Sequence, residues 1–309
     1  MRILFAATGQ IAVPTLTALA GKELVGAVLT APDAPGKRGK GLIPSPVKVE
    51  AERLGLPVLQ PEHLGSAARE EVGKHECDAL VSFCYGKIFG PKFLSLFSFT
   101  CNIHPSALPK YRGPSPLFYA IRNGDRSFAV SLQEIALRCD EGRLYLQKEF
   151  ELDGTETNGT LEERVSHLVP ELALSVFASD GEKKTVEQMG ESSWADFIRK
   201  EDGLIDFREG AGKLHAQIRA TYPWPKAVTS YNGTPLYLCS VSGSVFDIDG
   251  TPCTEAPGTV VCHDKKRGFK IATGLGYLYV DRLQLPTKKE MDSLSFLNGN
   301  KGIVGSRLG

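Results

Sequence analysis

The sequence predicts an α/β domain built on a parallel sheet, followed by a smaller domain of short β-strands. Residues 2–7 and 24–29 are continuous apolar runs, as expected of strands that are buried on both faces. A turn and a helical segment at 12–19 separate these runs, and the order strand, helix, strand predicts a βαβ unit with parallel strands. From about residue 204 the pattern changes to short strands divided by turn signals, which predicts a small barrel or sandwich.

Length and composition place the chain among ordinary globular proteins. Its 309 residues are enough for about two domains. The net charge is zero, so no field of the whole chain favours nucleic acid or a membrane. Seven scattered cysteines without a C-x-x-C pair predict reduced thiols in the cytoplasm, rather than a disulfide framework or a zinc site. Residues 1–6 run straight into the first strand, which predicts no signal peptide, and no apolar stretch approaches the roughly 18 residues of a membrane span.

The remaining elements of the first domain follow in order along the chain. Expected helices are 47–54, 64–74, 91–96, 116–123 and 161–179, and expected strands are 57–59, 78–84, 128–135 and 143–150. Before the first of these helices, residues 31–46 are rich in Gly and Pro and fit no regular element. A loop of this length in a compact domain is commonly functional or disordered, although its basic residues, Lys37, Arg38 and Lys40, could simply be solvated.

Polar groups are concentrated in residues 101–113. Asn102 and His104 are two residues apart, so on an extended strand they project from the same face. Pro105 and Pro109 then end the strand and stiffen the loop. A polar pair at the end of a strand is where α/β enzymes place their chemistry, and the alternative is a polar cap without chemistry.

Asp140 is the carboxylate that we expect beside this pair. It follows the predicted strand 128–135, and we expect the strand, helix and strand between His104 and Asp140 to return it to the same sheet edge. There it would fix the orientation of the imidazole, while Asn102 would donate a hydrogen bond to developing negative charge. Without an adjacent nucleophile, this set predicts direct transfer of a group to an incoming acceptor, with no metal. Asn102 and protonated His104 would stabilise the oxyanion, and a base would take the proton of the acceptor. A Ser–His–Asp hydrolase is rejected because Ser106 lacks a G-x-S-x-G setting.

The second domain is expected at 207–309, after a first domain at 1–180 and a polar linker at 181–206. It should contain one helix at 212–220 and strands at 227–231, 235–242, 258–262, 268–272 and 278–285. Residues 209–309 hold twelve Lys and Arg against eight Asp and Glu, so they carry about +4. Basic residues on barrel loops, among them Lys265, Lys266 and Arg267, suit RNA, although they could serve only solubility.

Several motifs together resemble one family. Asn102-Ile103-His104, the loop at 106–109 with Arg112-Gly113, and Asp140-x-Gly142 are similar to the signature of 10-formyltetrahydrofolate-dependent formyltransferases. The loop at 32–48, the strand that ends in Tyr85-Gly86, and the segment 218–225 with its Pro-Trp-Pro extend the resemblance over essentially the whole chain.

The resemblance implies a doubly wound, Rossmann-like first domain and an OB-like barrel as the second. It implies that the formyl group of 10-formyltetrahydrofolate is transferred to the α-amino group of methionine on initiator tRNA, with Asn102, His104 and Asp140 catalytic. Folate would contact Tyr85, Gly86, Ser106, Ala107, Leu108 and Pro109. The tRNA would contact Lys37, Arg38, Lys40, Lys265, Lys266 and Arg267. We expect a cytoplasmic monomer that binds no membrane.

Two alternatives remain at this point. One is a formyltransferase that acts on a small amine such as an amino-sugar nucleotide. The other is an RNA-binding protein whose enzyme domain is degenerate, in which Asn102 and His104 could be replaced without loss of function.

Overall fold

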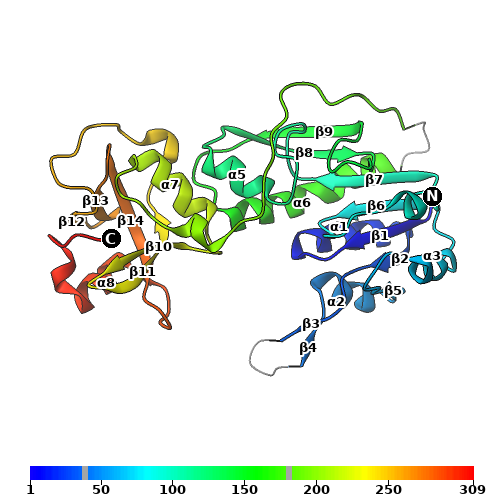
Figure 1. The fold of residues 1–309 in the computed structure, drawn as a ribbon, viewed down its shortest axis with the longest axis horizontal. Coiled ribbons are helices and arrows are strands. Elements are labelled where there is room, and N and C mark those ends of the chain that lie inside the picture. The colour runs from blue at the N-terminus through cyan, green and yellow to red at the C-terminus, as the bar shows by residue number, and fades with distance from the viewer. Residues whose placement is uncertain (37–40, 179–182) are drawn as a thin grey trace. The chain divides into compact units, whose positions relative to one another are not determined.

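The computed structural model describes residues 1–36, 41–178 and 183–309, which form two compact units (Figure 1). Unit 1 comprises Met1–Gly113, Ala129–Glu149 and Glu162–Trp194, and unit 2 comprises Pro114–Phe128, Phe150–Leu161 and Ala195–Gly309. Each unit is described by itself. Residues 179–182, where the predicted first domain ends and the linker begins, lie outside the described residues, so the division at 181–206 stays a prediction. In the described part of the chain, no helix combines the length and apolar character that crossing a bilayer requires.

A seven-stranded sheet in the order β5-β2-β1-β6-β7-β8-β9 forms the centre of unit 1. Its strands are β1 (Ile3–Ala7), β2 (Val25–Leu29), β5 (Val58–Leu59), β6 (Ala79–Phe83), β7 (Phe99–His104), β8 (Ser127–Gln133) and β9 (Leu144–Glu151). Strands β5, β2, β1, β6 and β7 are parallel, and β8 is antiparallel to β7. Every residue of β1, β2 and β6 is buried, which explains why their sequences are almost entirely apolar, with Ser82 the one polar residue. The predicted α/β domain with a mostly parallel sheet is therefore confirmed.

The helices between the strands are α1 (Val13–Ala20), α2 (Pro46–Arg53), α3 (Ser66–Gly73), α4 (Pro91–Leu94), α5 (Pro116–Arg122) and α6 (Asn158–Phe177). Several begin where the sequence supplies a helix start. At α2, Pro46 occupies the first turn and the Ser45 hydroxyl accepts a hydrogen bond from the Lys48 amide at 3.0 Å. Each helix predicted in this part of the chain is present with its ends shifted by a few residues.

The loop at 31–46 contains more structure than the sequence predicts. Two short antiparallel strands, β3 (Ala34–Pro35) and β4 (Leu42–Ile43), pair on either side of the segment 37–40, which lies outside the described residues. The expectation of no regular element was therefore wrong. Because all four strand residues are exposed, this pairing depends on backbone hydrogen bonds and leaves no hydrophobic pattern in the sequence.

Unit 2 is built on an antiparallel sheet in the order β10-β11-β14-β13-β12, with β15 paired to β14. Its elements are α7 (Ala211–Ala220), β10 (Ala227–Tyr231), β11 (Thr234–Val241), β12 (Val260–Asp264), β13 (Gly268–Ala272), β14 (Tyr277–Gln284), β15 (Met291–Asp292) and α8 (Ser293–Gly299). No pairing of β10 with β12 closes this sheet among the described residues, so the OB-like barrel stays a prediction. The sequence did not predict β15 and α8, because each is too short to show a periodic pattern.

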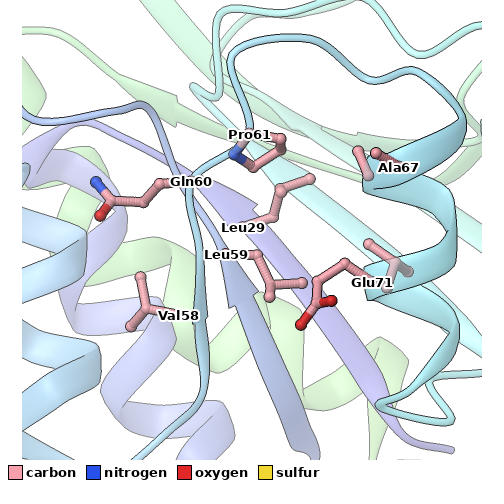
Figure 2. A pocket seen from close by; sticks show the side chains of 9 residues that line it. Leu29, Val58, Leu59, Gln60, Pro61, Ala67 and Glu71 are labelled. Atoms are coloured by element: carbon pink, nitrogen blue, oxygen red, sulfur yellow. The ribbon is translucent and has the colours of Figure 1, made fainter.

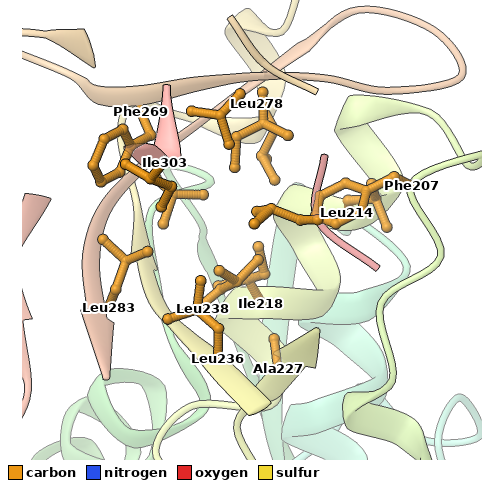
Figure 3. Close-up of a cluster of buried hydrophobic side chains, with 14 of the residues drawn as sticks. Phe207, Leu214, Ile218, Ala227, Leu236, Leu238, Phe269, Leu278, Leu283 and Ile303 are labelled. Atoms are coloured by element: carbon orange, nitrogen blue, oxygen red, sulfur yellow. The ribbon is translucent and has the colours of Figure 1, made fainter. Parts of the chain in front are cut away.

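The core of unit 2 lies between this sheet and α7. Leu214 and Ile218, four residues apart on the helix, point toward Leu236, Leu238 and other buried residues of the strands (Figure 3). This spacing places both side chains on one helix face, which is why the helix packs on the sheet.

Candidate active site

The candidate site lies at the carboxyl ends of the central strands of unit 1. The chain moves from β1 to β2 on one side and later to β6 on the other, so the strand order reverses beside β1. Thr8, after β1, donates its hydroxyl to the Tyr85 carbonyl, after β6, at 3.2 Å. Strand β7 is parallel to β6 and ends at His104. Ligands of open α/β sheets bind at this kind of reversal, because the loops there diverge.

Asn102, His104 and Asp140 converge, as the sequence predicts. Asn102 donates from Nδ2 to Asp140 Oδ1 at 3.2 Å, and His104 Nδ1 lies 3.5 Å from the same oxygen. The side chains of His104 and Asp140 are each only 7% exposed. Electrostatic interactions between two such buried groups are screened by water far less than those of a surface pair.

The second ring nitrogen of His104 determines which tautomer is present. Nε2 lies 2.8 Å from the Tyr111 carbonyl oxygen, and because that oxygen can only accept, Nε2 carries a proton. The neutral ring then has its lone pair on Nδ1, the atom that faces Asp140. A second proton taken up by His104 would therefore sit on Nδ1 beside a carboxylate.

Asp140 reaches this position by a different route from the predicted one. Strand β8 runs antiparallel to β7, with Gln133 opposite Asn102 and Ser131 opposite His104, so the connection after β8 leaves toward the start of β7. The chain must turn back before Asp140 can approach the pair. Asp140 adopts a φ of +55°, a left-handed conformation that Asp tolerates better than most residues.

Gly142 is required by the same turn. A Cβ atom at this position would lie 1.8 Å from the Glu134 carbonyl oxygen, so only glycine fits. This close approach explains the Asp140-x-Gly142 spacing in physical terms.

Further residues, which the sequence does not predict, hold Asp140. Gln133 donates from Nε2 to Asp140 Oδ1 at 2.9 Å, and the Gly113 amide donates to Oδ2 at 2.9 Å. The Cys139 thiol lies 3.3 Å from Oδ2. Each contact brings a donor to the carboxylate, which in its ionised form can accept hydrogen bonds but cannot donate them. The sequence offered one signal, since Gln133 is a polar residue within the predicted strand 128–135; its place opposite Asn102 is visible only in the structure.

The loop at 106–109, predicted to contact folate, is buried and braced. The Ser106 hydroxyl donates to the Lys110 carbonyl at 2.7 Å, and the Ser131 hydroxyl donates to the Ser106 carbonyl at 2.6 Å. Gln147 donates to the Leu108 carbonyl at 3.0 Å. A pocket of about 400 Å³ opens on this loop, lined by Ala107, Leu108, Pro109, Lys110, Gln147, Met189, Gly190, Glu191, Ser192 and Ser193.

Tyr85 and Gly86, the other predicted folate contacts, follow β6. Tyr85 is 4% exposed and stacks on Phe89 with ring centroids 5.4 Å apart. Burial raises the pKa of Tyr85 to about 12, and its hydroxyl has no hydrogen-bond partner among the described residues. Gly86 is exposed and turns the chain with a φ of +84°.

A second pocket, of about 370 Å³, contains none of the predicted site residues. Leu29, Leu59, Pro61 and Ala67 give it a largely apolar wall, and Glu71 lies at its side (Figure 2). It is formed at the β5 edge of the sheet, with three strands between β5 and β7.

The predicted tRNA contacts fall into two groups. Lys37, Arg38 and Lys40 lie outside the described residues. Lys265, Lys266 and Arg267 are exposed in the turn between β12 and β13 of unit 2. The Arg267 guanidinium lies 3.8 Å from the centre of the Tyr279 ring, a cation–π contact that holds it against the sheet.

An α/β domain with a mostly parallel sheet and an Asn–His–Asp cluster at the carboxyl ends of its strands has the architecture of an enzyme. Among the described residues, no cluster of three or more His, Cys, Asp or Glu side chains is placed to bind a metal ion. The family model described as Formyl transferase matches residues 1–177, and the one described as Formyl transferase, C-terminal domain, matches residues 197–301. The chain belongs to the formyl transferase family.

Relatives cover the whole chain. Methionyl-tRNA formyltransferase of Borrelia hermsii (strain HS1 / DAH) is 35% identical over 308 residues, which are 99% of both chains. The protein of the same name from Lachnospira eligens is 36% identical over 318 residues, with both chains fully covered. The structure of HypX from Aquifex aeolicus in complex with tetrahydrofolic acid matches 99% of this chain with a TM-score of 0.63 and 18% identity. The chain spans about half the length of HypX, 48%, and at this identity the likeness concerns the fold alone.

Proposed function

We propose that this protein transfers the formyl group of 10-formyltetrahydrofolate to the α-amino group of methionyl initiator tRNA. The observation that carries the proposal is the convergence of Asn102, His104 and Asp140 in one buried cluster. The name of its full-length relatives, methionyl-tRNA formyltransferase, supports the choice of acceptor.

The chemistry is direct transfer through a tetrahedral intermediate. The amine of the acceptor attacks the formyl carbon, and the carbonyl oxygen becomes negative. Asn102 donates one Nδ2 hydrogen to Asp140 and has a second with which to stabilise that oxygen. The bond from the formyl carbon to folate nitrogen then breaks, the amine loses a proton, and the folate nitrogen gains one.

His104 holds or moves a proton at Nδ1 in this scheme. Its Nε2 is engaged by the Tyr111 carbonyl, which leaves Nδ1 as the atom that faces the cluster. Asp140 stabilises the doubly protonated ring and keeps its plane in place.

The folate co-substrate would lie against the loop at 106–109 and the turn at Tyr85 and Gly86. The Ser106 hydroxyl is used inside the loop, so we propose that it braces the wall while the exposed part of Ala107 contacts the ligand. The adjoining pocket of about 400 Å³ lies within the range of small-molecule sites.

Unit 2 would bind tRNA. We propose that the antiparallel sheet serves as an OB-like surface, with Lys265, Lys266 and Arg267 on phosphates. The loop that carries Lys37, Arg38 and Lys40 would engage the acceptor end. The proposed domains are the catalytic domain at 1–180 and the tRNA-binding domain at 207–309, joined by a linker at 181–206.

One assay tests the proposal. The protein is incubated with 10-formyltetrahydrofolate and charged initiator tRNA, and the formylated aminoacyl ester is measured. An amino-sugar nucleotide replaces the tRNA in a parallel reaction. Formylation of the sugar without formylation of the tRNA would identify the protein as a small-amine formyltransferase, and formylation of neither would overturn the proposal.

A further inference from the structure

A glutamine from the segment after α6 contacts the loop that carries Asp140. Gln188 donates from Nε2 to the carbonyl oxygens of Asp140 and Gly142, each at 2.8 Å. It lies 3.2 Å from Oε1 of Gln133 as well. The sequence assigns this segment to a linker, yet here it contacts both sides of the turn at Asp140.

Arg112 determines which way the Gln188 amide points. Its NH2 group donates to Gln188 Oε1 at 2.8 Å, and its NH1 group donates to Glu141 Oε1 at 3.1 Å. Since a guanidinium only donates, the oxygen of Gln188 must face Arg112 and the nitrogen must face the two carbonyls. The reversed amide would place three oxygens together and leave Arg112 facing a donor.

The same constraint passes to Gln133. Its Oε1 accepts from the Gly142 amide at 3.1 Å and faces Gln188 Nε2, so its own Nε2 is directed at Asp140 Oδ1. Orientation is thus transmitted from Arg112 through two side-chain amides to the carboxylate that faces His104.

We propose that Gln188 is a positioning residue that holds the Asp140 carboxylate in register with His104 and Asn102. This role rests on the proposed function. Such a residue is needed because of the conformation of the loop that carries Asp140. Asp140 has a left-handed φ of +55°, and residues 134–143 belong to no helix or strand, so contacts from outside the loop contribute to holding its position. Hydrogen bonds from Gln188 to two of its carbonyls supply that restraint.

The first test compares rates. Gln188→Ala should lower kcat of formyl transfer by about 10- to 100-fold while the KM values for folate and tRNA change less than about threefold, since displacement of a reacting group by about 1 Å has an effect of this size. Gln188→Glu keeps the size and the Arg112 contact but cannot donate, so it should behave like Gln188→Ala.

Gln217→Ala is the matched control. Gln217 is half-buried like Gln188 and donates from Nε2 to two carbonyl oxygens, those of Asp202 at 2.9 Å and Leu204 at 2.8 Å, within unit 2. Its removal should leave kcat within about twofold of wild type. Full activity of Gln188→Glu, or an equal loss in Gln217→Ala, would overturn the proposal.

The second test does not need activity. Amide hydrogen exchange of residues 134–142 should quicken in Gln188→Ala relative to wild type, with no such change in Gln217→Ala, both measured on full-length protein without substrate. Unchanged exchange in Gln188→Ala would overturn the positioning role. A wild-type protein that formylates nothing would instead overturn the proposed function, while the exchange result would still report on the loop.

Discussion

Each unit buries one histidine against a backbone carbonyl, and the two histidines differ in the partner of the other ring nitrogen. His104 in unit 1 has Nε2 on the Tyr111 carbonyl and Nδ1 facing the Asp140 carboxylate. His215 in unit 2 has Nε2 3.1 Å from the Gly243 carbonyl, and its Nδ1 accepts from Arg219 Nε at 3.1 Å. The partner of this nitrogen is therefore a carboxylate in unit 1 and a guanidinium in unit 2.

The His215 cluster has a structural role within unit 2. Arg219 is buried in α7 and also donates to the Glu156 carbonyl at 2.8 Å, so the His215 cluster ties a helix to a loop of the same unit. Burial and the neighbouring Arg219 lower the pKa of His215 to about 4. The two buried histidines therefore differ in the chemical nature of the group at the second ring nitrogen.

The largest expected effect is on turnover. His104→Ala and Asn102→Ala should each lower kcat by about 10²–10³ or more, because the proposed mechanism uses Asn102 to stabilise the developing charge and His104 to hold or move a proton. His215→Gln should leave kcat within about threefold, since its cluster lies in unit 2 and contacts none of the predicted site residues that the structure describes. Single-turnover formylation of charged tRNA measures both. Near-normal activity of His104→Ala would favour the degenerate-enzyme alternative.

The second prediction concerns stability and pH. The pKa of His215 is lowered to about 4 in the folded state, against about 6.5 when unfolded, so the unfolded chain binds more protons between these values. The contribution of His215 to the free energy of unfolding is complete above about pH 6.5. The free energy of unfolding should therefore fall by up to about 3 kcal/mol as the pH drops to about 4. Urea unfolding should show a shallower fall for His215→Gln than for wild type. If the free energy of unfolding fell equally with pH in wild type and in His215→Gln, the expected contribution of His215 would be contradicted.

The third prediction asks whether unit 2 acts through binding alone. Replacing Lys265, Lys266 and Arg267 together by alanine should raise KM for tRNA by about tenfold or more, with kcat at saturation unchanged. The slope of log affinity against log salt should decrease by roughly 0.7–0.9 for each phosphate that the variant no longer neutralises. Lys74→Ala, an exposed lysine paired with Glu71 in unit 1, serves as the charge control. If the variant showed the same salt slope as wild type, the turn between β12 and β13 would not contribute to the tRNA-binding surface.

The smallest expected effect is at Arg38. Arg38→Ala should raise KM for tRNA by up to about tenfold, equivalent to about 1.4 kcal/mol, and leave folate affinity unchanged. Equilibrium binding of the folate co-substrate and steady-state kinetics with tRNA separate the two effects. If folate affinity decreased as much as KM for tRNA increased, the role assigned to the loop at 31–46 would be contradicted.

Much of unit 1 could be predicted from local pattern. β1, β2 and β6 are buried on both faces, so their positions appear as apolar runs. Asn102 and His104 share a strand face because side chains alternate with a period of two. The short pair β3 and β4 could not be predicted in this way, since its exposed residues leave no such period.

The sequence by itself determined the order of the elements, the Asn–His pair and the membership of the family, because these depend on residue type, spacing and motif. Tertiary structure alone decided how Asp140 is held. Strand β8 runs antiparallel to β7, and the turn that carries Asp140 lies outside the helices and strands. Gln133 donates to the Asp140 carboxylate, and Gln188 donates to the Asp140 carbonyl. The partners of both glutamines include backbone groups, which every residue carries, and hydrogen bonds to such groups leave no mark in the sequence until the chain has folded.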